Sequence, residues 1–392
     1  MSSPTPAGSP TPERFISRGS ARTVLVTGGA GFIGSHTCLE LLQHGYDVVS
    51  VDDYSNSSPV ALERVAELAG RPLAGVHTLD IADRDALDAV FRRHRIDAVI
   101  HFAARKAVGE STELPLEYHL SNVATTLRLL ERMRAHGVKD LVFSSSCSIY
   151  GAGSSEHQKV PLAEDDPPAP ANPYARTKLY CEQVLADVCA QDPDWRVIAL
   201  RYFNPTGAHR SGRLGEDPRG VPNNLMPYLA QVAVGRRPHL NVFGGDWPTH
   251  DGTCVRDYLH VEDVADGHRV ALEHLADQPV PHAGEHPDGR GLRVLNLGTG
   301  VGSSVLDLVR AFETACGREL PFRIVGRRAG DVPELIADPA RVAKSWDWRT
   351  RYDLARMCAD AWAFQQANRH GYEAPATVSA PGPTSSNRKV SG

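Results

Sequence analysis

The residues from Thr23 to Gly34 constrain the fold more than any other part of this 392-residue chain. A short apolar run, Val-Leu-Val, is followed there by glycines at Gly28, Gly31 and Gly34, and an amphipathic helical pattern comes next. The apolar run predicts a buried β-strand. Glycines between a strand and a helix let the backbone approach a ligand closely, and the helix N-terminus offers free N–H groups. The segment therefore predicts a turn that binds a pyrophosphate.

A second strand pattern supports this expectation. Residues 47–51 (DVVSV) form this pattern, and Asp52 follows them directly, 18 residues after Gly34. An acid at about this distance binds the adenosine ribose in Rossmann units, and a carboxylate would repel a 2′-phosphate, so Asp52 favours NAD over NADP. A glycine pattern alone also fits an ordinary loop. Its Gly-x-x-Gly-x-x-Gly spacing resembles that of the extended short-chain dehydrogenase/reductase superfamily.

Strand and helix patterns then alternate along the chain. We expect strands at 76–79, at 97–104 with the following turn, and from 141, and helices over 61–68, 83–94 and 114–135. Strands separated by helices of this length form a parallel sheet with helices on both faces. The predicted fold class is α/β, a Rossmann-type doubly wound parallel sheet with a smaller mixed α/β substrate domain. Ligands bind at the carboxyl ends of such strands.

The composition argues against several other classes of protein. Hydrophobic residues make up 41% of the chain and charged residues 23%, as in ordinary globular proteins. The net charge of −5 favours neither a nucleic-acid partner nor an anionic membrane, and no apolar run is long enough to cross a bilayer. Seven scattered cysteines without a Cys-x-x-Cys pair indicate a reducing, cytoplasmic location and no metal site.

The two ends of the chain differ from its centre. Residues 1–21 and 371–392 are rich in small and polar residues and in proline, so we expect disordered extensions, and the first has no apolar segment typical of a secretory signal. Between them we expect an NAD-binding Rossmann domain at 22–203 and a substrate-binding domain at 204–370, with segments that can interleave.

The residues that carry chemistry follow the fifth strand. Ser146 ends a serine-rich segment, and Tyr174 and Lys178 lie four residues apart in a helix that extends to about residue 190. The pair therefore shares one helix face, where the lysine charge should lower the pKa of the phenol. With the Ser146 hydroxyl nearby, the phenol becomes a base for a sugar hydroxyl. The pair alone also fits a solvated helix face, but its place after the glycine turn and the serine-rich strand favours catalysis. Structural roles are expected for Ser144, Ser145 and Tyr150.

These motifs together give the chain a specific resemblance. Over about residues 22–372 it is similar to the UDP-glucose 4-epimerase (UDP-galactose 4-epimerase) family. Ala104-Arg105 stands where that family often has Gly-Leu, Cys147-Ser148 stands where Ala-Thr is usual, and 278–291 looks like a His/Pro-rich insertion. The resemblance is carried by residues 27–34, 101–110, 143–151, 172–178, 201–209, 215–237, 251–260, 296–300 and 327–331.

The resemblance implies a tightly bound NAD and a UDP-sugar substrate. Paired arginines suit a diphosphate, because a guanidinium donates two parallel hydrogen bonds. The residues implied at NAD are Gly28, Gly31, Phe32, Ile33, Gly34, Asp52, Asn56, Ser57, Asp80, Ile81, Phe102, Ala103, Lys106, Asn122, Ser146, Tyr174, Lys178 and Phe203. Those implied at the UDP-sugar are Ser146, Tyr174, Asn204, Asn224, Leu225, Asn241, Val242, Phe243, Arg256, Tyr258, Arg328, Asp331 and Leu335.

The resemblance also implies a reaction, the interconversion of UDP-glucose and UDP-galactose in galactose metabolism or in the supply of UDP-galactose for glycans. Tyr174 would take the proton of the sugar 4-hydroxyl while hydride passes to NAD, the 4-keto sugar would rotate, and hydride would return to its other face. A homodimer is implied, formed by the helix from Leu114 and the helix after Tyr174. Its candidate contacts are Leu127, Leu130, Val184 and Val188.

Three alternatives stay open. The enzyme could epimerise other UDP-sugars, with N-acetyl or pentose groups. Leu335, expected beside the sugar, offers an acetamido group no hydrogen bond and predicts that N-acetyl sugars are poor substrates. A nucleotide-sugar 4,6-dehydratase would have Asp-Glu where Cys147-Ser148 stands. A non-catalytic NAD-sensing regulator would usually lack the Tyr–Lys pair, which is intact here.

Overall fold

The computed structural model describes residues 22–151, 160–277, 291–328 and 330–372. The predicted extension at 1–21 lies outside the described residues, as do nearly all of the tail predicted at 371–392 and of the insertion at 278–291. No helix in the described part of the chain is both long and apolar enough to span a bilayer.

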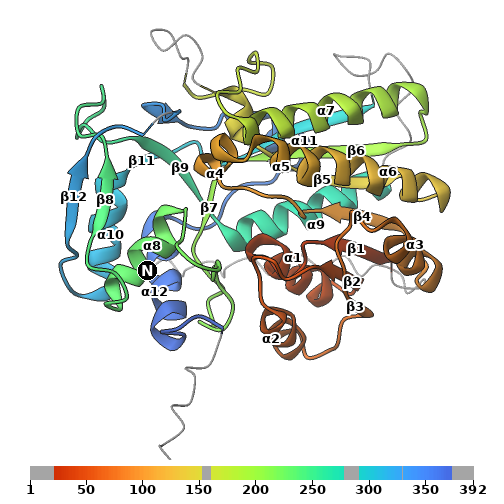
Figure 1. Cartoon of the computed structure of the whole chain (residues 1–392), viewed down its shortest axis with the longest axis horizontal. Helices are drawn as coiled ribbons and strands as arrows, with labels where there is room; N and C mark the ends of the chain where they lie inside the picture. Colours follow the sequence, from red (N-terminus) through yellow and green to blue (C-terminus); the bar gives the residue numbers. More distant parts are fainter. Residues whose placement is uncertain (1–21, 152–159, 278–290, 329, 373–392) are drawn as a thin grey trace, which may run out of the picture.

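The larger part of the molecule is built on a seven-stranded sheet, in which every pair of neighbouring strands is parallel (Figure 1). The strand order is β10-β6-β5-β4-β1-β2-β3, which reverses direction between β1 and β4. This order confirms the predicted Rossmann-type sheet and places its ligand crevice at the carboxyl ends of these central strands. The strands are β1 (Thr23–Thr27), β2 (Asp47–Asp52), β3 (Gly75–Thr78), β4 (Ala98–His101), β5 (Asp140–Ser146), β6 (Arg196–Tyr202) and β10 (Leu292–Leu297).

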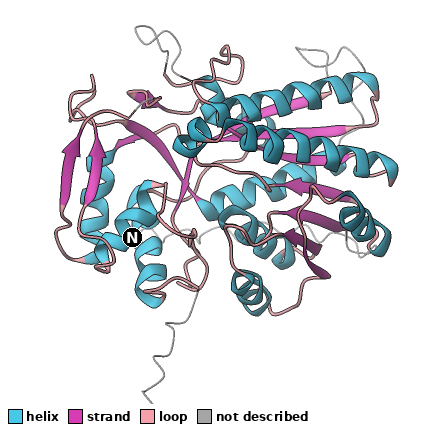
Figure 2. Cartoon of the chain, in the orientation of Figure 1, coloured by secondary structure: helices cyan, strands magenta, loops and turns pink. Residues whose placement is uncertain are grey.

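Helices cover both faces of this sheet (Figures 1 and 2). On one face α1 (Phe32–Gln43), α2 (Pro59–Ala69) and α9 (Val261–Asp277) share a hydrophobic core with the strands. On the other, α3 (Arg84–Arg93), α6 (Thr125–Ala135) and α7 (Pro173–Gln191) share a second core. Because α9 and β10 follow residue 204 in the chain, residues on both sides of the predicted boundary at 203/204 contribute to this part.

The long helix predicted over 114–135 is confirmed, because the backbone is helical without a break from Pro115 to Ala135. It consists of α5 (Pro115–Tyr118), a π-helical turn η1 (His119–Ala124) and α6, and a short separate helix, α4 (Val108–Glu113), precedes it. Pro115 has no N–H to continue the preceding helix, so a new one starts there. The Thr126 hydroxyl donates to the carbonyl of Asn122 (2.7 Å), one of the side-chain bonds that accompany the π-turn. Such turns are frequent at functional sites.

The smaller part of the molecule holds two short sheets and three packed helices. One sheet contains β7 (Asn204–Thr206), β9 (Val255–His260), β11 (Gly302–Ser304) and β13 (Glu334–Leu335), and the other contains β8 (Leu240–Phe243) and β12 (Phe322–Val325). The helices α8 (Leu225–Ala233), α10 (Val305–Cys316) and α12 (Leu354–Ala367) enclose a third core. The remaining elements are the 3₁₀ turn η2 (Cys147–Tyr150) and α11 (Ala340–Trp346).

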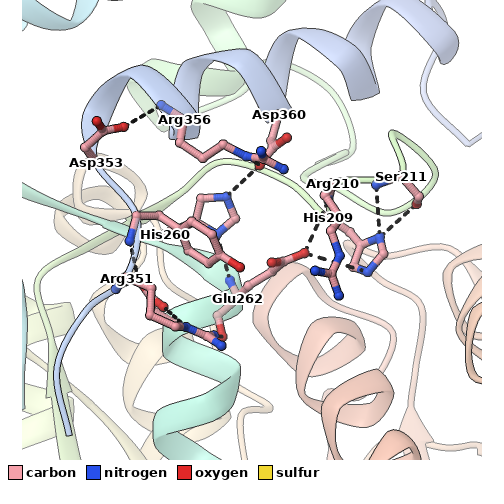
Figure 3. A network of polar contacts seen from close by, with 11 residues as sticks. His209, Arg210, Ser211, His260, Glu262, Arg351, Asp353, Arg356 and Asp360 are labelled. Atoms are coloured by element: carbon pink, nitrogen blue, oxygen red, sulfur yellow. Dashed lines mark hydrogen bonds and ion pairs between the residues drawn. The ribbon is translucent and has the colours of Figure 1, made fainter. Parts of the chain in front are cut away.

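A polar network fixes the C-terminal helix α12 against the start of α9 (Figure 3). The buried His260 contacts the carboxylate of Asp360 through Nε2 (3.2 Å), and Arg356 donates to the same carboxylate (2.6 Å). The Glu262 N–H donates to Nδ1 of His260 (3.0 Å), and the Glu262 carboxylate accepts from the Arg210 N–H (3.2 Å). The network therefore ties three segments that are distant in sequence to one another.

Candidate active site

The glycine turn after β1 is closed to any larger residue. Gly28 has φ +69°, and a Cβ there would lie 2.8 Å from the Ala103 nitrogen. A Cβ at Gly34 would lie 2.1 Å from the Gly28 carbonyl oxygen. Gly31 is the N-cap of α1 and provides no side chain to cap it, which leaves the first N–H groups of the helix for a ligand. This geometry fits a bound pyrophosphate.

Asp52 lies at the end of β2, beside the glycine turn. One carboxylate oxygen accepts a hydrogen bond from the Ala30 N–H (2.9 Å), and the other accepts from the Tyr54 N–H (2.9 Å) and the Ser57 hydroxyl (2.7 Å). The Leu79 N–H donates to the Asp52 carbonyl (3.1 Å), which brings the segment with Asp80 and Ile81 alongside. The predicted adenosine-side residues therefore come together, as a dinucleotide requires.

The segment after β4 continues the same crevice. Phe102 and Ala103 follow the strand, and the Phe102 N–H donates to the Thr27 carbonyl (3.0 Å). Buried Asn122 holds the backbone of Arg105 from both sides, accepting from its N–H (2.8 Å) and donating to its carbonyl (3.0 Å). Asn122 thus fixes the loop that carries Lys106.

The three predicted catalytic residues meet between β5 and α7. The Asn172 side chain caps α7 by accepting from the Ala175 N–H (2.9 Å), and Pro173 occupies the first helical position, both favourable at a helix start. Tyr174 in the first turn is hydrogen-bonded to Ser146 at the end of β5. One turn later Lys178 donates through Nζ to the Ser144 carbonyl (2.6 Å).

The expected lowering of the Tyr174 pKa is wrong for this arrangement. Burial raises the pKa of Tyr174 to about 12, and the hydrogen bond to Ser146 offsets only part of that effect. Burial also lowers the pKa of Lys178 to about 8. The Lys178 ammonium is directed at the Ser144 carbonyl and lies over the Phe143 ring, 5.0 Å from its centroid, so desolvation outweighs the attraction that the sequence argument assumed.

The opposite wall of the site comes from the smaller part of the molecule. Asn204 on β7 pairs in register with Tyr258 on β9, and Arg256 on β9 pairs with Leu335 on β13. Leu335 also packs against a small cluster that contains Phe203 and Cys147. The predicted sugar-side residues are thus brought next to the residue that follows Ser146.

The two predicted diphosphate arginines converge on one segment. Arg256 donates to the carbonyls of Val255 (2.8 Å) and Val332 (3.0 Å). Arg328 forms an ion pair with Asp331 (2.8 Å) and lies over the Phe243 ring, 5.4 Å from its centroid. On β8, Phe243 and its neighbour Asn241 are exposed. Val242 between them is a core residue, so its backbone alone can face a ligand.

Glu216 connects the two sides of the crevice and was missed by the sequence reasoning. Its carboxylate oxygen Oε1 accepts from Lys106 Nζ (2.9 Å) and from the side chain of Asn224 (2.8 Å), the residue before Leu225 at the start of α8. A few residues later the Arg219 N–H donates to the Asn56 side chain (3.0 Å). Glu216 lies in the stretch 215–237 that carries the family resemblance, and this was the one sequence feature that could have pointed to it.

Comparisons with known proteins agree with this geometry. Residues 24–284 match the model of the NAD dependent epimerase/dehydratase family. The chain belongs to this family. The UDP-glucose 4-epimerase of Bacillus subtilis is 50% identical over 350 residues, which cover 89% of this chain and 98% of the relative. The mouse UDP-glucose 4-epimerase is 49% identical over 360 residues, which cover 90% of this chain and 99% of the relative.

Solved structures of the family share the fold. A UDP-glucose 4-epimerase from Bifidobacterium longum, in complex with NAD⁺ and UDP, superposes with a TM-score of 0.83 at 46% identity, covering 89% of this chain and 99% of that one. A UDP-glucose 4-epimerase from Stenotrophomonas maltophila, with bound NAD and formylated UDP-arabinopyranose, superposes with a TM-score of 0.82 at 48% identity. The match again covers 89% of this chain and 99% of that one.

Proposed function

We propose that this epimerase interconverts UDP-glucose and UDP-galactose with a tightly bound NAD. The observation that carries the proposal is the convergence of Ser146, Tyr174 and Lys178 at the end of β5, in a sheet whose glycine turn after β1 fits a bound pyrophosphate. The named UDP-glucose 4-epimerases at about half identity over nearly the whole chain support the same conclusion. As part of the same proposal, the enzyme acts in galactose metabolism or supplies UDP-galactose for glycans.

The residues of the chain have separate roles in this reaction. NAD supplies the hydride acceptor and donor, and the residues implied at the cofactor would hold it at the carboxyl ends of β1, β2 and β4. Tyr174 must first lose its own proton to solvent, and its phenolate then takes the proton of the sugar 4-hydroxyl and later returns it, while Ser146 holds the phenolic oxygen and the substrate oxygen together. Lys178 keeps a positive charge next to the phenol as the proton leaves. Arg256 and Arg328 bind the diphosphate, which leaves the sugar free to turn.

The structure around Ser146 offers little for dehydration. Cys147 and Ser148, where a 4,6-dehydratase would have Asp-Glu, form the start of η2. Burial raises the pKa of the Cys147 thiol to about 12, so it is neither acid nor base at physiological pH. The dehydratase is therefore not favoured.

We also propose a homodimer and a reducing, cytoplasmic location. The helices α5, α6 and α7 lie side by side (Figure 1), and with η1 they carry four exposed apolar side chains: Leu116 (64% exposed), Leu120 (57%), Leu127 (46%) and Tyr180 (41%). Of the four contacts expected from the sequence, Leu127 alone is in this group. Leu130, Val184 and Val188 pack against the core. All seven cysteines lie in the described ranges as free thiols.

The decisive experiment is incubation of the purified protein with UDP-galactose and no added cofactor. Formation of UDP-glucose, together with release of NAD on denaturation, is the expected result. A protein that consumes UDP-galactose only when free NAD is added, or that releases stoichiometric NADP, would contradict the proposal.

A further inference from the structure

Glu182 lies one helical turn after Lys178 on α7, on the side that faces β5. It is almost fully buried, and its carboxylate accepts a hydrogen bond from the Ser145 hydroxyl (2.5 Å). Three α7 side chains at four-residue spacing thus contact three consecutive residues of one strand. The contacts are Tyr174 with Ser146, Lys178 with the Ser144 carbonyl, and Glu182 with Ser145.

Arg201 on β6 holds the Glu182 carboxylate from the other side. Its Nε donates to Oε1 (3.0 Å) and one terminal nitrogen donates to Oε2 (2.6 Å), a bidentate pair with both side chains less than 10% exposed. The other terminal nitrogen donates to the Tyr150 hydroxyl (3.0 Å), and Tyr150 packs against Phe203 (ring centroids 6.4 Å apart). The pair therefore joins α7, β5 and β6 at the edge where the catalytic residues lie.

The charges around Lys178 are few. Burial lowers the pKa of His101 on β4 to about 3, and it raises the pKa values of Cys181 on α7 and Tyr202 on β6, so these neighbours stay neutral near pH 7. Tyr174 is also protonated there, since burial raises its pKa. Among the described residues, Glu182 is thus the charged group that acts on Lys178, and Arg201 is the partner of Glu182. Burial lowers the pKa of Lys178, while Cys181 and Glu182 act in the opposite sense.

We propose that Glu182, held by Arg201, is a positioning residue for the epimerisation. It fixes the strand that carries Ser146 against the helix that carries Tyr174 and Lys178, and it supplies the negative charge that keeps Lys178 protonated. The inference rests on the proposed function, because it assigns Glu182 a role in that reaction.

The test compares Glu182→Gln with the wild-type holoenzyme. The amide removes one negative charge and leaves the Arg201 charge uncompensated, so the Lys178 proton becomes easier to lose. We expect kcat for UDP-galactose to fall at least about tenfold at neutral pH, with KM changed by less than about twofold. The alkaline limb of the kcat profile should move to lower pH by about one unit.

Asp140→Asn is the matched control. Asp140 at the start of β5 forms a bidentate pair with Arg196 of β6 (2.6 and 2.7 Å), at the opposite end of the same two strands. Both variants neutralise a buried carboxylate that pairs with a guanidinium, and Asp140 also pairs with Arg22, so both should lower Tm, but Asp140→Asn should leave kcat and its pH profile close to wild type. Equal kcat losses in the two variants, with an unmoved alkaline limb, would overturn the proposal.

Ser145→Ala covers the case in which Glu182→Gln does not fold. It detaches β5 from the carboxylate and leaves both charges in place, so kcat should fall severalfold while the alkaline limb, the Tm and the affinity for UDP stay near wild type. Wild-type kcat in Ser145→Ala would remove the positioning role.

A readout without turnover separates this inference from the proposed function. Trace acetylation of Lys178 across pH, quantified by mass spectrometry, reports its pKa in each folded variant. We expect a lower pKa in Glu182→Gln than in the wild type and an unchanged pKa in Asp140→Asn. An inactive wild type would refute the proposed function, whereas an unchanged Lys178 pKa in Glu182→Gln would refute this inference.

Discussion

At the scale of single residues, Tyr174 is the side chain on which turnover should depend most. Tyr174→Phe removes the hydroxyl bonded to Ser146 and keeps the ring, so UDP-sugar binding should persist while kcat falls about 10²–10⁴-fold. Steady-state kinetics with UDP-galactose, and calorimetry with UDP, measure the two effects. Tyr180→Phe, on the exposed side of the same helix, is the control and should keep wild-type kcat. Near wild-type turnover in Tyr174→Phe would refute the mechanism.

Leu335 sets the expected substrate breadth. It pairs with Arg256 and packs against the cluster of Phe203 and Cys147, the residue after Ser146. An acetamido group against this apolar wall loses roughly 1–3 kcal/mol, about 5- to 150-fold in kcat/KM. UDP-N-acetylgalactosamine should therefore be a poor substrate, and Leu335→Ser should raise its kcat/KM relative to UDP-galactose.

Two kinetic results would contradict this role. An unchanged ratio of kcat/KM values in Leu335→Ser would show that Leu335 packs against its own surroundings and does not meet the sugar. Equal use of both sugars by the wild type would exclude a barrier to N-acetyl groups altogether.

The site residues divide by how far the sequence alone could place them. Tyr174 and Lys178 are a local pair, so helical spacing was enough to put them on one face. Glu182 continues that spacing, but the positioning role proposed for it depends on its hydrogen bonds with Ser145 and Arg201. Tertiary packing brings these two residues to Glu182, so helical spacing could not predict them. The Tyr174 pKa depends on burial, which a charge argument from the sequence leaves out.

At the scale of elements, the strand–turn–helix unit β1–α1 should be the least tolerant of substitution. In Gly34→Ala the new methyl would meet the Gly28 carbonyl at 2.1 Å, so either the turn or α1 must shift. Overpacking of this kind costs typically about 1–3 kcal/mol. We expect a lower Tm and a loss of co-purifying NAD, measured by absorbance of the denatured supernatant.

Gly109→Ala provides the comparison. Gly109 lies in α4, and a Cβ there meets nothing within 4 Å. Since alanine is favoured over glycine in a helix by roughly 0.5–1 kcal/mol, this variant should be at least as stable as wild type and should retain NAD. If Gly34→Ala also retained NAD at wild-type stoichiometry, the glycine turn would not be the pyrophosphate site.

Element prediction succeeded where the pattern was local and missed a feature that accompanies contacts between distant side chains. The helix predicted over 83–94 forms as α3, and the Asp83 side chain caps it by accepting from the N–H groups of Asp85 and Ala86. The helix predicted over 114–135 also forms, but its pattern did not reveal the π-turn η1 inside it. The contacts of Asn122 with Arg105, a residue of the preceding loop, accompany the π-turn, and residue spacing within one segment could not predict them.

At the scale of the whole molecule, α7 faces two ways. Its inner side carries Tyr174, Lys178 and Glu182, and its outer side carries Tyr180, whose ring stacks on His119 of η1 (centroids 5.8 Å apart). The exposed apolar group of Leu116, Leu120, Leu127 and Tyr180 thus lies on the solvent-facing sides of α7 and of the helices that contact it. A second copy covering it would bury these side chains and brace α7, so dimerisation and site rigidity would be linked.

Leu120→Glu tests this link. A carboxylate placed in an apolar contact between two copies loses its solvation without a partner, which costs several kcal/mol and should raise the dimer dissociation constant about 100-fold or more. Light scattering should show a dimer for the wild type and a monomer for the variant, with a lower Tm because α7 loses its brace. Val301→Glu, a change at an equally exposed apolar residue outside this group, should remain dimeric. A wild type that is strictly monomeric at micromolar concentration, or a Leu120→Glu dimer as tight as wild type, would place the assembly surface elsewhere or remove it.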